Sequence, residues 1–189
     1  MNYFQISAGY VPPATGSWSS DCREDPWSVS LAEKGVITLD DARRPIRDVD
    51  YMAELIERRD VEAMAALVDA GRHVAMTIRR SRKPVLASVN GVAAGGGANL
   101  ALACDLRIAS DQARLGQSFN RIGLHPDWGG TYFLPRLVGP AKALELFWFA
   151  DLVDARECER LGLFNKVVPH AQLADATRTW ARALAEREG

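Results

Sequence analysis

Three consecutive glycines, Gly95, Gly96 and Gly97, stand between two apolar runs of the chain. Residues 84–89 before them are rich in β-branched side chains and predict a strand, whereas residues 98–103 after them predict a short helix. The first turn of a helix has backbone N–H groups without internal partners, and the helix dipole adds positive potential there. Because glycine lacks a Cβ atom, a ligand atom can come close to this backbone. The turn is therefore suited to an oxygen atom that carries negative charge.

Four roles for this glycine turn compete. A phosphate-binding P-loop would end in Lys followed by Ser or Thr, which residues 91–99 lack. A dinucleotide fingerprint would need glycine at the position of Leu100. An oxyanion hole, in which backbone N–H groups stabilise a developing enolate or tetrahedral oxygen, fits the turn. A plain packing turn between strand and helix fits it equally, so the glycines alone leave the last two roles open.

The elements that must position this turn alternate between short strands and helices. Residues 51–81 carry apolar side chains at steps of three and four, which predicts a helix that ends before Pro84. Asp154 is predicted to cap a later helix, because aspartate accepts a hydrogen bond from the first turn. Further strands are predicted at residues 106–109, 113–116 and 166–168, and further helices at residues 131–137, 141–149, 155–161 and 171–188. This alternation predicts an α/β architecture.

The first fifty residues differ in character from the rest. They are rich in Pro, Ser, Trp and Asp, and only residues 35–39 predict a short strand. We therefore predict an irregular N-terminal segment at residues 1–50 and a core at residues 51–189 that ends in a C-terminal helix.

The composition excludes several classes of function. The chain has 189 residues, a formal net charge of −1 and a pI of about 6.3, so the basic face of a nucleic-acid-binding protein is not expected. No apolar run approaches the roughly 18 residues of a membrane span. The three cysteines are far apart, which predicts no zinc knuckle and a reduced, cytoplasmic setting. The basic side chains of residues 79–83 predict a solvated helix end, with contact to phosphates as the alternative.

Three long stretches of the sequence carry a family resemblance. KPVLASVNGVAAGGGANLALACDLRIAS, residues 83–110, resembles the second oxyanion motif of the crotonase family, the enoyl-CoA hydratases and isomerases. FNRIGLHPDWGGTYFLPRLVGPAKALEL, residues 119–146, and ARECERLGLFNKVVP, residues 155–169, follow at the family's spacing. The resemblance implies a crotonase-like (ClpP/crotonase) spiral core of short strands and helices. It also implies an acyl-CoA thioester whose oxygen rests on backbone N–H groups, one of them from Gly96. No metal or redox cofactor is implied, since the substrate itself carries coenzyme A, and the family assembles as homo-oligomers.

Three positions set this chain apart from the hydratases of that family. Hydratases add water with two glutamates, and Asn99 and Phe119 stand at those positions here. Neither side chain transfers protons at neutral pH. Asp127, within GLHPDWGG, stands where several isomerases carry their one catalytic acid, as in the ring-forming and Δ3,Δ2-enoyl-CoA isomerases of phenylacetate breakdown. A single carboxylate is enough to move a proton from the α-carbon to the γ-carbon of an enolate. Alternatively, Asp127 caps the following helix.

The resemblance thus predicts a site and leaves rivals to it. Asp127 and Gly96 are the predicted catalytic residues. The residues predicted to contact the acyl-CoA are Ala93, Gly95, Gly96, Phe119, Pro126 and Asp127. The rival functions are a catalytically impaired acyl-CoA binder and another crotonase reaction such as thioester hydrolysis. Only residues 4–11 hint at the family's first oxyanion motif, and its C-terminal helices have no counterpart, so we expect a truncated version of the fold.

Overall fold

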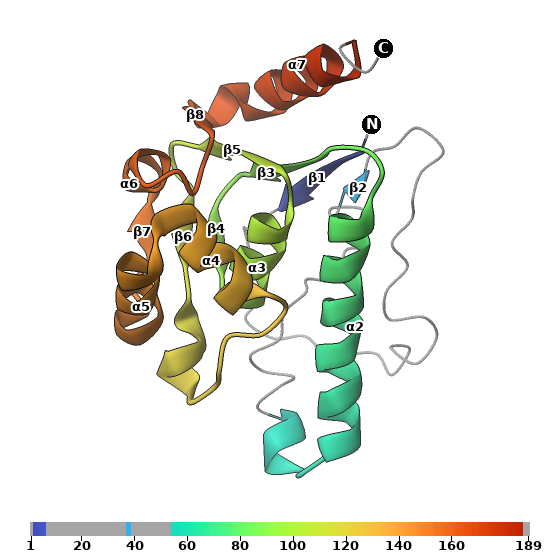
Figure 1. The fold of residues 1–189 in the computed structure, drawn as a ribbon, viewed down its shortest axis with the longest axis vertical. Coiled ribbons are helices and arrows are strands. Elements are labelled where there is room, and N and C mark those ends of the chain that lie inside the picture. Colours follow the sequence, from blue (N-terminus) through green and yellow to red (C-terminus); the bar gives the residue numbers. More distant parts are fainter. Residues whose placement is uncertain (1, 7–36, 39–53, 187–189) are drawn as a thin grey trace, which may run out of the picture.

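The computed structural model describes residues 2–6, 37–38 and 54–186, and Figure 1 shows their arrangement. Five strands form a wholly parallel sheet in the order β2-β1-β3-β5-β8. Their bounds are β1 Asn2–Ile6, β2 Ile37–Thr38, β3 Val85–Val89, β5 Leu106–Ser110 and β8 Lys166–Val168. Parallel strands are normally covered on both faces, and all five residues of β3 are buried.

The two faces of the sheet contact different helices, because side chains alternate along a strand. Val85, Ala87 and Val89 belong to the large core cluster, which also contains side chains of α2 (Val61–Arg80) and α3 (Gly96–Ala103). Leu86 belongs to a second cluster with Ile108 and Leu173, on the face covered by α7 (Leu173–Ala185). In Figure 1, α7 crosses the sheet strands on the side away from α2 and α3.

A second, smaller sheet carries the connection after the glycine turn. Strand β4 (Val92–Ala94) pairs in parallel with β6 (Arg114–Gly116), and β6 pairs in antiparallel with β7 (Val153–Asp154). The glycine turn leads from β4 into α3, and the 3-10 helix η1 (Ser118–Ile122) leaves the end of β6. Because β4 and β6 are neighbouring parallel strands, α3 and η1 both begin at the same edge of the smaller sheet.

The remaining helices cover the smaller sheet and complete the fold. Helices α4 (Gly130–Val138), α5 (Pro140–Phe149) and α6 (Ala155–Arg160) follow one another along the chain, and η2 (His170–Gln172) precedes α7. Asp154 accepts a hydrogen bond from the Glu157 N–H and caps α6, as predicted. Buried Arg107 donates to the carbonyl oxygens of Leu163 and Cys104 and so ties the end of α3 to the segment after α6.

Most elements predicted from the sequence are confirmed, and the structure differs from the prediction at three places. The helix predicted at residues 51–81 is interrupted. Residues 54–57 are helical, and Arg59 has a φ of +52°, which breaks the helix. Helix α2 then begins, and Asp60 caps it by accepting a hydrogen bond from the Ala63 N–H. Strand β4 was not predicted. The prediction of an irregular N-terminal segment is wrong at residues 2–6, because they pair with β3, a long-range contact that no local pattern reveals. Apart from β1 and β2, residues 1–50 lie outside the described residues, as does most of the hinted first oxyanion motif.

The α/β architecture is confirmed. In the part of the chain that the structure describes, no helix is long and apolar enough to cross a membrane.

Candidate active site

Within the described residues, the backbone of the glycine turn leaves the Gly96 N–H group without a protein acceptor. Gly95 has a φ of +53°, and its N–H donates to the Gly116 carbonyl at 2.9 Å, which joins the turn to β6. Gly96 is the first residue of α3, and the Asn99 N–H begins the helical pattern by donating to the Gly95 carbonyl at 3.0 Å. Among the described residues, none accepts a hydrogen bond from the Gly96 N–H. A free N–H at a helix N-terminus is what an oxyanion donor requires.

Trp128 packs directly on this turn. A Cβ atom added to Gly96 would lie 2.3 Å from Cζ3 of the indole, and one added to Gly71 of α2 would lie 1.9 Å from its Cε2. The indole N–H donates to the Val68 carbonyl of α2 at 2.9 Å. The side chain therefore lies between two glycines of different helices, and only glycine leaves room for it at either position.

Asp127 begins a tight turn whose backbone is strained. The Gly130 N–H donates to the Asp127 carbonyl at 2.9 Å, and the two central residues, Trp128 and Gly129, have φ values of +43° and +88°. Positive φ at both central residues is the geometry of a type I′ turn. For a bulky L-residue such as Trp128 this conformation costs on the order of 1–3 kcal/mol and persists only where neighbouring contacts hold it.

The Asp127 carboxyl group is buried without a partner for one of its oxygens. Among the described residues, Oδ1 has no hydrogen-bond partner and is shielded from solvent. Burial raises the pKa of Asp127 to about 6, while a hydrogen bond from its own backbone and the charge of His125 act in the opposite direction. The alternative in which Asp127 caps α4 is wrong, because Gly129 holds the N-cap position and no side chain caps this helix. A half-buried carboxyl with a pKa close to neutrality can both take and return a proton.

Two buried amides connect the glycine turn with Asp127. Asn99, fully buried on α3, donates from Nδ2 to the Asp127 carbonyl at 2.9 Å. Its Oδ1 accepts from Nε2 of Gln117 at 2.8 Å, and Gln117 is only 1% exposed. The sequence analysis did not single out Gln117. Its one sequence signal is a polar side chain directly after the predicted strand 113–116, two residues before Phe119, which stands at the position of a hydratase glutamate.

The other residues predicted to contact the acyl-CoA differ in burial and in how close they lie to the glycine turn. Phe119 is buried in η1, and its ring lies 3.7 Å from the position a Cβ atom of Gly95 would take. Pro126 is half-buried next to Asp127. The side chain of Ala93 belongs to the large core cluster, so its backbone alone remains for contact with a ligand. The structure thus brings Gly95, Gly96, Phe119 and Asp127 into one neighbourhood, while their roles remain predictions.

The remaining polar candidates lie elsewhere. His125 is exposed and contacts the Pro126 carbonyl, whereas His170 contacts Ser110 on the far side of β5. Burial raises the pKa of the Cys104 and Cys158 thiols to about 12, so neither is a ready nucleophile. Among the described residues, no group of three metal-ligating side chains gathers.

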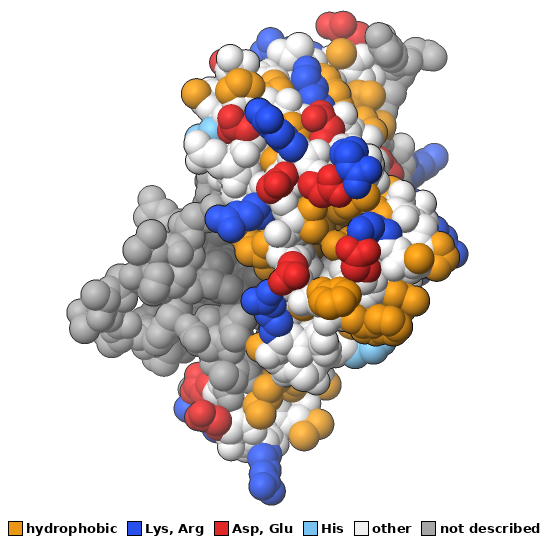
Figure 2. Space-filling view, turned by 90° about the vertical axis from the view of Figure 1, so that its left-hand side faces the viewer, with side chains coloured by type: hydrophobic (Ala, Val, Ile, Leu, Met, Phe, Trp, Pro, Cys, Tyr) orange, Lys and Arg blue, Asp and Glu red, His pale blue; other side chains and the backbone are white. Residues whose placement is uncertain are grey.

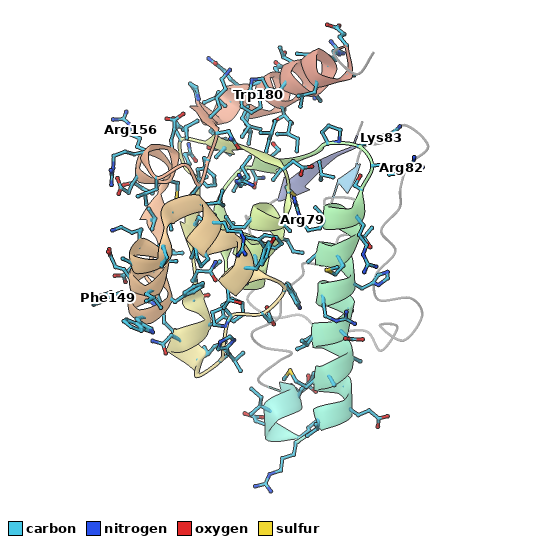
Figure 3. The ribbon with its side chains drawn as sticks, in the orientation of Figure 1. Arg79, Arg82, Lys83, Phe149, Arg156 and Trp180 are labelled. Atoms are coloured by element: carbon cyan, nitrogen blue, oxygen red, sulfur yellow. The ribbon has the colours of Figure 1, made fainter. Side chains whose placement is uncertain are left out.

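The basic run at the end of α2 divides into two parts. Figure 3 shows Arg79 pointing from α2 toward α3, where it donates to the Ala103 carbonyl and to Asp105. Arg82 and Lys83 lie in the following loop and are exposed, in agreement with the predicted solvated helix end.

Comparison with known proteins shows the class to which this fold and glycine turn belong. The enoyl-CoA hydratase/isomerase family model matches residues 52–188. A crotonyl-CoA hydratase from Syntrophomonas wolfei is 42% identical over 142 residues, which cover 74% of this chain and 52% of the relative. A probable enoyl-CoA hydratase from Rhodobacter capsulatus is 51% identical over 102 residues, covering 54% and 40% respectively. The crystal structure of enoyl-CoA hydratase from Bacillus anthracis superposes with a TM-score of 0.65 at 36% identity, covering 66% of this chain and 48% of that one.

The fold is therefore crotonase-like, as the sequence predicted. The chain belongs to the enoyl-CoA hydratase/isomerase family. It spans about half the length of the first curated relatives it matches, at 52% and 40% of their residues. These relatives are named hydratases, and the isomerase subtype inferred from the motif around Asp127 has no counterpart in their names.

Proposed function

We propose that this protein binds an enoyl-CoA thioester and moves its double bond with a single carboxylate. The observation that carries the proposal is Asp127, a half-buried residue with a pKa of about 6 whose shielded Oδ1 has no hydrogen-bond partner among the described residues. In the proposed reaction, the Gly96 N–H holds the thioester oxygen as negative charge develops there. Asp127 takes a proton from the α-carbon of a 3-enoyl-CoA, whose double bond joins the β- and γ-carbons. The double bond shifts to join the α- and β-carbons, and Asp127 returns the proton to the γ-carbon.

The positions that would distinguish a hydratase support this choice. Asn99 and Phe119 stand where the family's hydratases carry their two glutamates. Asn99 uses both ends of its amide on Gln117 and on the Asp127 backbone, and Phe119 is buried. Neither residue can activate a water molecule as a glutamate does.

An isotope experiment tests the single carboxylate directly. A 3-enoyl-CoA deuterated at the α-carbon should give a conjugated product with part of the label at the γ-carbon, since one group carries the same proton between both carbons. Formation of the conjugated thioester is followed by its absorbance, and the label is located by mass spectrometry. A conjugated product with no label at the γ-carbon would contradict the one-carboxylate route.

Hydration is the second candidate, because the curated relatives are named hydratases. It predicts that a 2-enoyl-CoA loses its conjugated absorbance when incubated with the protein. The same assays distinguish the two remaining alternatives, which are thioester hydrolysis and acyl-CoA binding without catalysis. Thioester hydrolysis would release a free coenzyme A thiol, and an inactive binder would take up acyl-CoA without any of these changes.

Two further expectations belong to the proposal. We propose a homo-oligomer, supported by exposed apolar side chains on α5 and the segment after it. They are Leu144, Trp148, Phe149 and Leu152. Figure 2 looks onto this side of the molecule, where apolar groups lie among charged ones, and Figure 3 shows Phe149 pointing outward. A cytoplasmic setting and a reaction without cofactor also remain proposals.

A further inference from the structure

Gln117 is a buried polar residue that the proposed chemistry does not use. It follows the end of β6, and its Nε2 donates to Asn99 Oδ1 at 2.8 Å. Asn99 in turn donates from Nδ2 to the Asp127 carbonyl at 2.9 Å. Two buried amides therefore connect the smaller sheet with the residue proposed to carry the proton.

The direction of these hydrogen bonds follows from the chemistry of the groups. A carbonyl oxygen only accepts, so Nδ2 of Asn99 must face Asp127 and Oδ1 must face Gln117. Gln117 must then present Nε2, which leaves its Oε1 buried without a partner among the described residues. A buried acceptor without a partner costs free energy. A gain in stability therefore does not explain why a glutamine is buried at this position. The effect that the structure does show is that Gln117 orients the Asn99 amide by donating to its Oδ1.

The Asp127 carbonyl, which is the last acceptor in this series of hydrogen bonds, belongs to the strained turn. It accepts from both Asn99 Nδ2 and the Gly130 N–H, and Trp128, which lies between Asp127 and Gly130 in the turn, has a φ of +43°. A strained conformation persists only where the surrounding contacts fix it. The hydrogen bond that Asn99 donates is one of these contacts, and its acceptor is the backbone carbonyl of Asp127, the residue that bears the proposed catalytic carboxyl group.

We propose that Gln117 is a positioning residue, which orients Asn99 so that Asn99 holds the Asp127 turn and keeps the carboxyl group in its buried place. The proposal rests on the function proposed above and extends it to a residue that does not touch the substrate. Desolvation is the largest cause of the raised pKa of Asp127, and within the described part of the chain His125 is the ionisable neighbour whose charge acts on it. A turn that relaxes toward solvent should therefore lower the pKa of Asp127.

Gln117→Met tests this role, because methionine keeps the length of the side chain and removes both polar atoms. The pKa of the Asp127 carboxyl, measured by NMR titration of the full chain, should fall from about 6 toward its ordinary value. Isomerase kcat should fall roughly 10- to 100-fold with little change in KM, as expected for a displaced catalytic group. Gln117→Glu can donate to Asn99 only when the introduced carboxyl is protonated. Its activity relative to Gln117→Met should therefore recover as the pH falls.

Thr177→Val is the matched control, because it also removes a buried side-chain hydrogen bond. Thr177 of α7 bonds Ser88 Oγ at 2.9 Å on the other face of the main sheet. This variant should lose thermal stability and keep the pKa of Asp127 and kcat. An unchanged pKa and kcat in Gln117→Met would overturn the proposal. If that variant does not fold, an unchanged Asp127 pKa and pH profile in Gln117→Glu would overturn it equally. Wild-type protein without isomerase activity, combined with a lowered Asp127 pKa in Gln117→Met, would refute the proposed function and support the positioning role.

Discussion

Replacing Asp127 with asparagine separates the proton-carrying role of this residue from its shape. Asparagine keeps the outline of the side chain and one acceptor oxygen but cannot carry the proton. If Asp127 is the proton shuttle, turnover of a 3-enoyl-CoA should fall by a factor on the order of 10²–10⁴, the usual share of general acid–base catalysis. The affinity for acyl-CoA should change little, because the thioester oxygen is held by the backbone of the glycine turn.

The same substitution should stabilise the fold at neutral pH. The pKa of Asp127 is raised from 3.8 to about 6 in the folded chain, so its contribution to stability is present below pH 4 and is lost as the pH rises through about 6. That difference in pKa corresponds to about 3 kcal/mol. The side chain is partly exposed, and solvent screening reduces the value to roughly 1–2 kcal/mol. Asparagine does not ionise. The free energy of unfolding of Asp127→Asn should therefore exceed that of the wild type by this amount above pH 6, and the two values should be equal near pH 4.

Urea unfolding between pH 4 and pH 8, combined with the isomerase assay, measures both effects. Asp154→Asn is the control, because Asp154 caps α6 and asparagine caps a helix as well as aspartate does. This control should leave turnover unchanged. Unchanged isomerase turnover in Asp127→Asn would refute the proposed mechanism. An absent gain in stability above pH 6 would refute the assignment of a raised pKa.

Three further predictions test the surroundings of the site. Gly96→Ala should abolish activity and destabilise the fold by roughly 1–3 kcal/mol, because its Cβ atom would lie 2.3 Å from the Trp128 indole. Gly97→Ala should be tolerated, because the added Cβ atom meets none of the described residues within 4 Å, and equal unfolding midpoints of the two variants would contradict the packing. Asn99→Glu should not produce a hydratase, since a carboxylate cannot donate to the Asp127 carbonyl as Asn99 does, and phenylalanine remains at the second glutamate position. Loss of 2-enoyl-CoA absorbance with this variant would count against the proposed division of roles. Trp148→Ser removes a side chain that is 66% exposed on α5 and should weaken self-association in sedimentation experiments, whereas a wild-type monomer would contradict the predicted oligomer.

The sequence determined much of the fold through local physical rules. The β-branched run at residues 84–89 predicted β3, and Asp154 predicted the start of α6, because strand propensity and helix capping act over a few residues. The glycine turn predicted a helix start with free N–H groups, and α3 begins at Gly96. The resemblance to crotonases also came from uninterrupted motifs, and the family assignment confirms it.

The tertiary structure decided the environment of the proposed acid. Asn99 and Asp127 are 28 residues apart, Gln117 and Asn99 are 18 apart, and Trp128 reaches a carbonyl 60 residues earlier in the chain. Burial raises the pKa of Asp127, and burial depends on how segments far apart in the sequence pack. No pattern of neighbouring residues encodes such contacts, because each depends on how separate helices and strands pack. The sequence by itself therefore named the family and the candidate acid, and the packing of α2, α3 and the turn at Asp127 set the proton affinity of that acid.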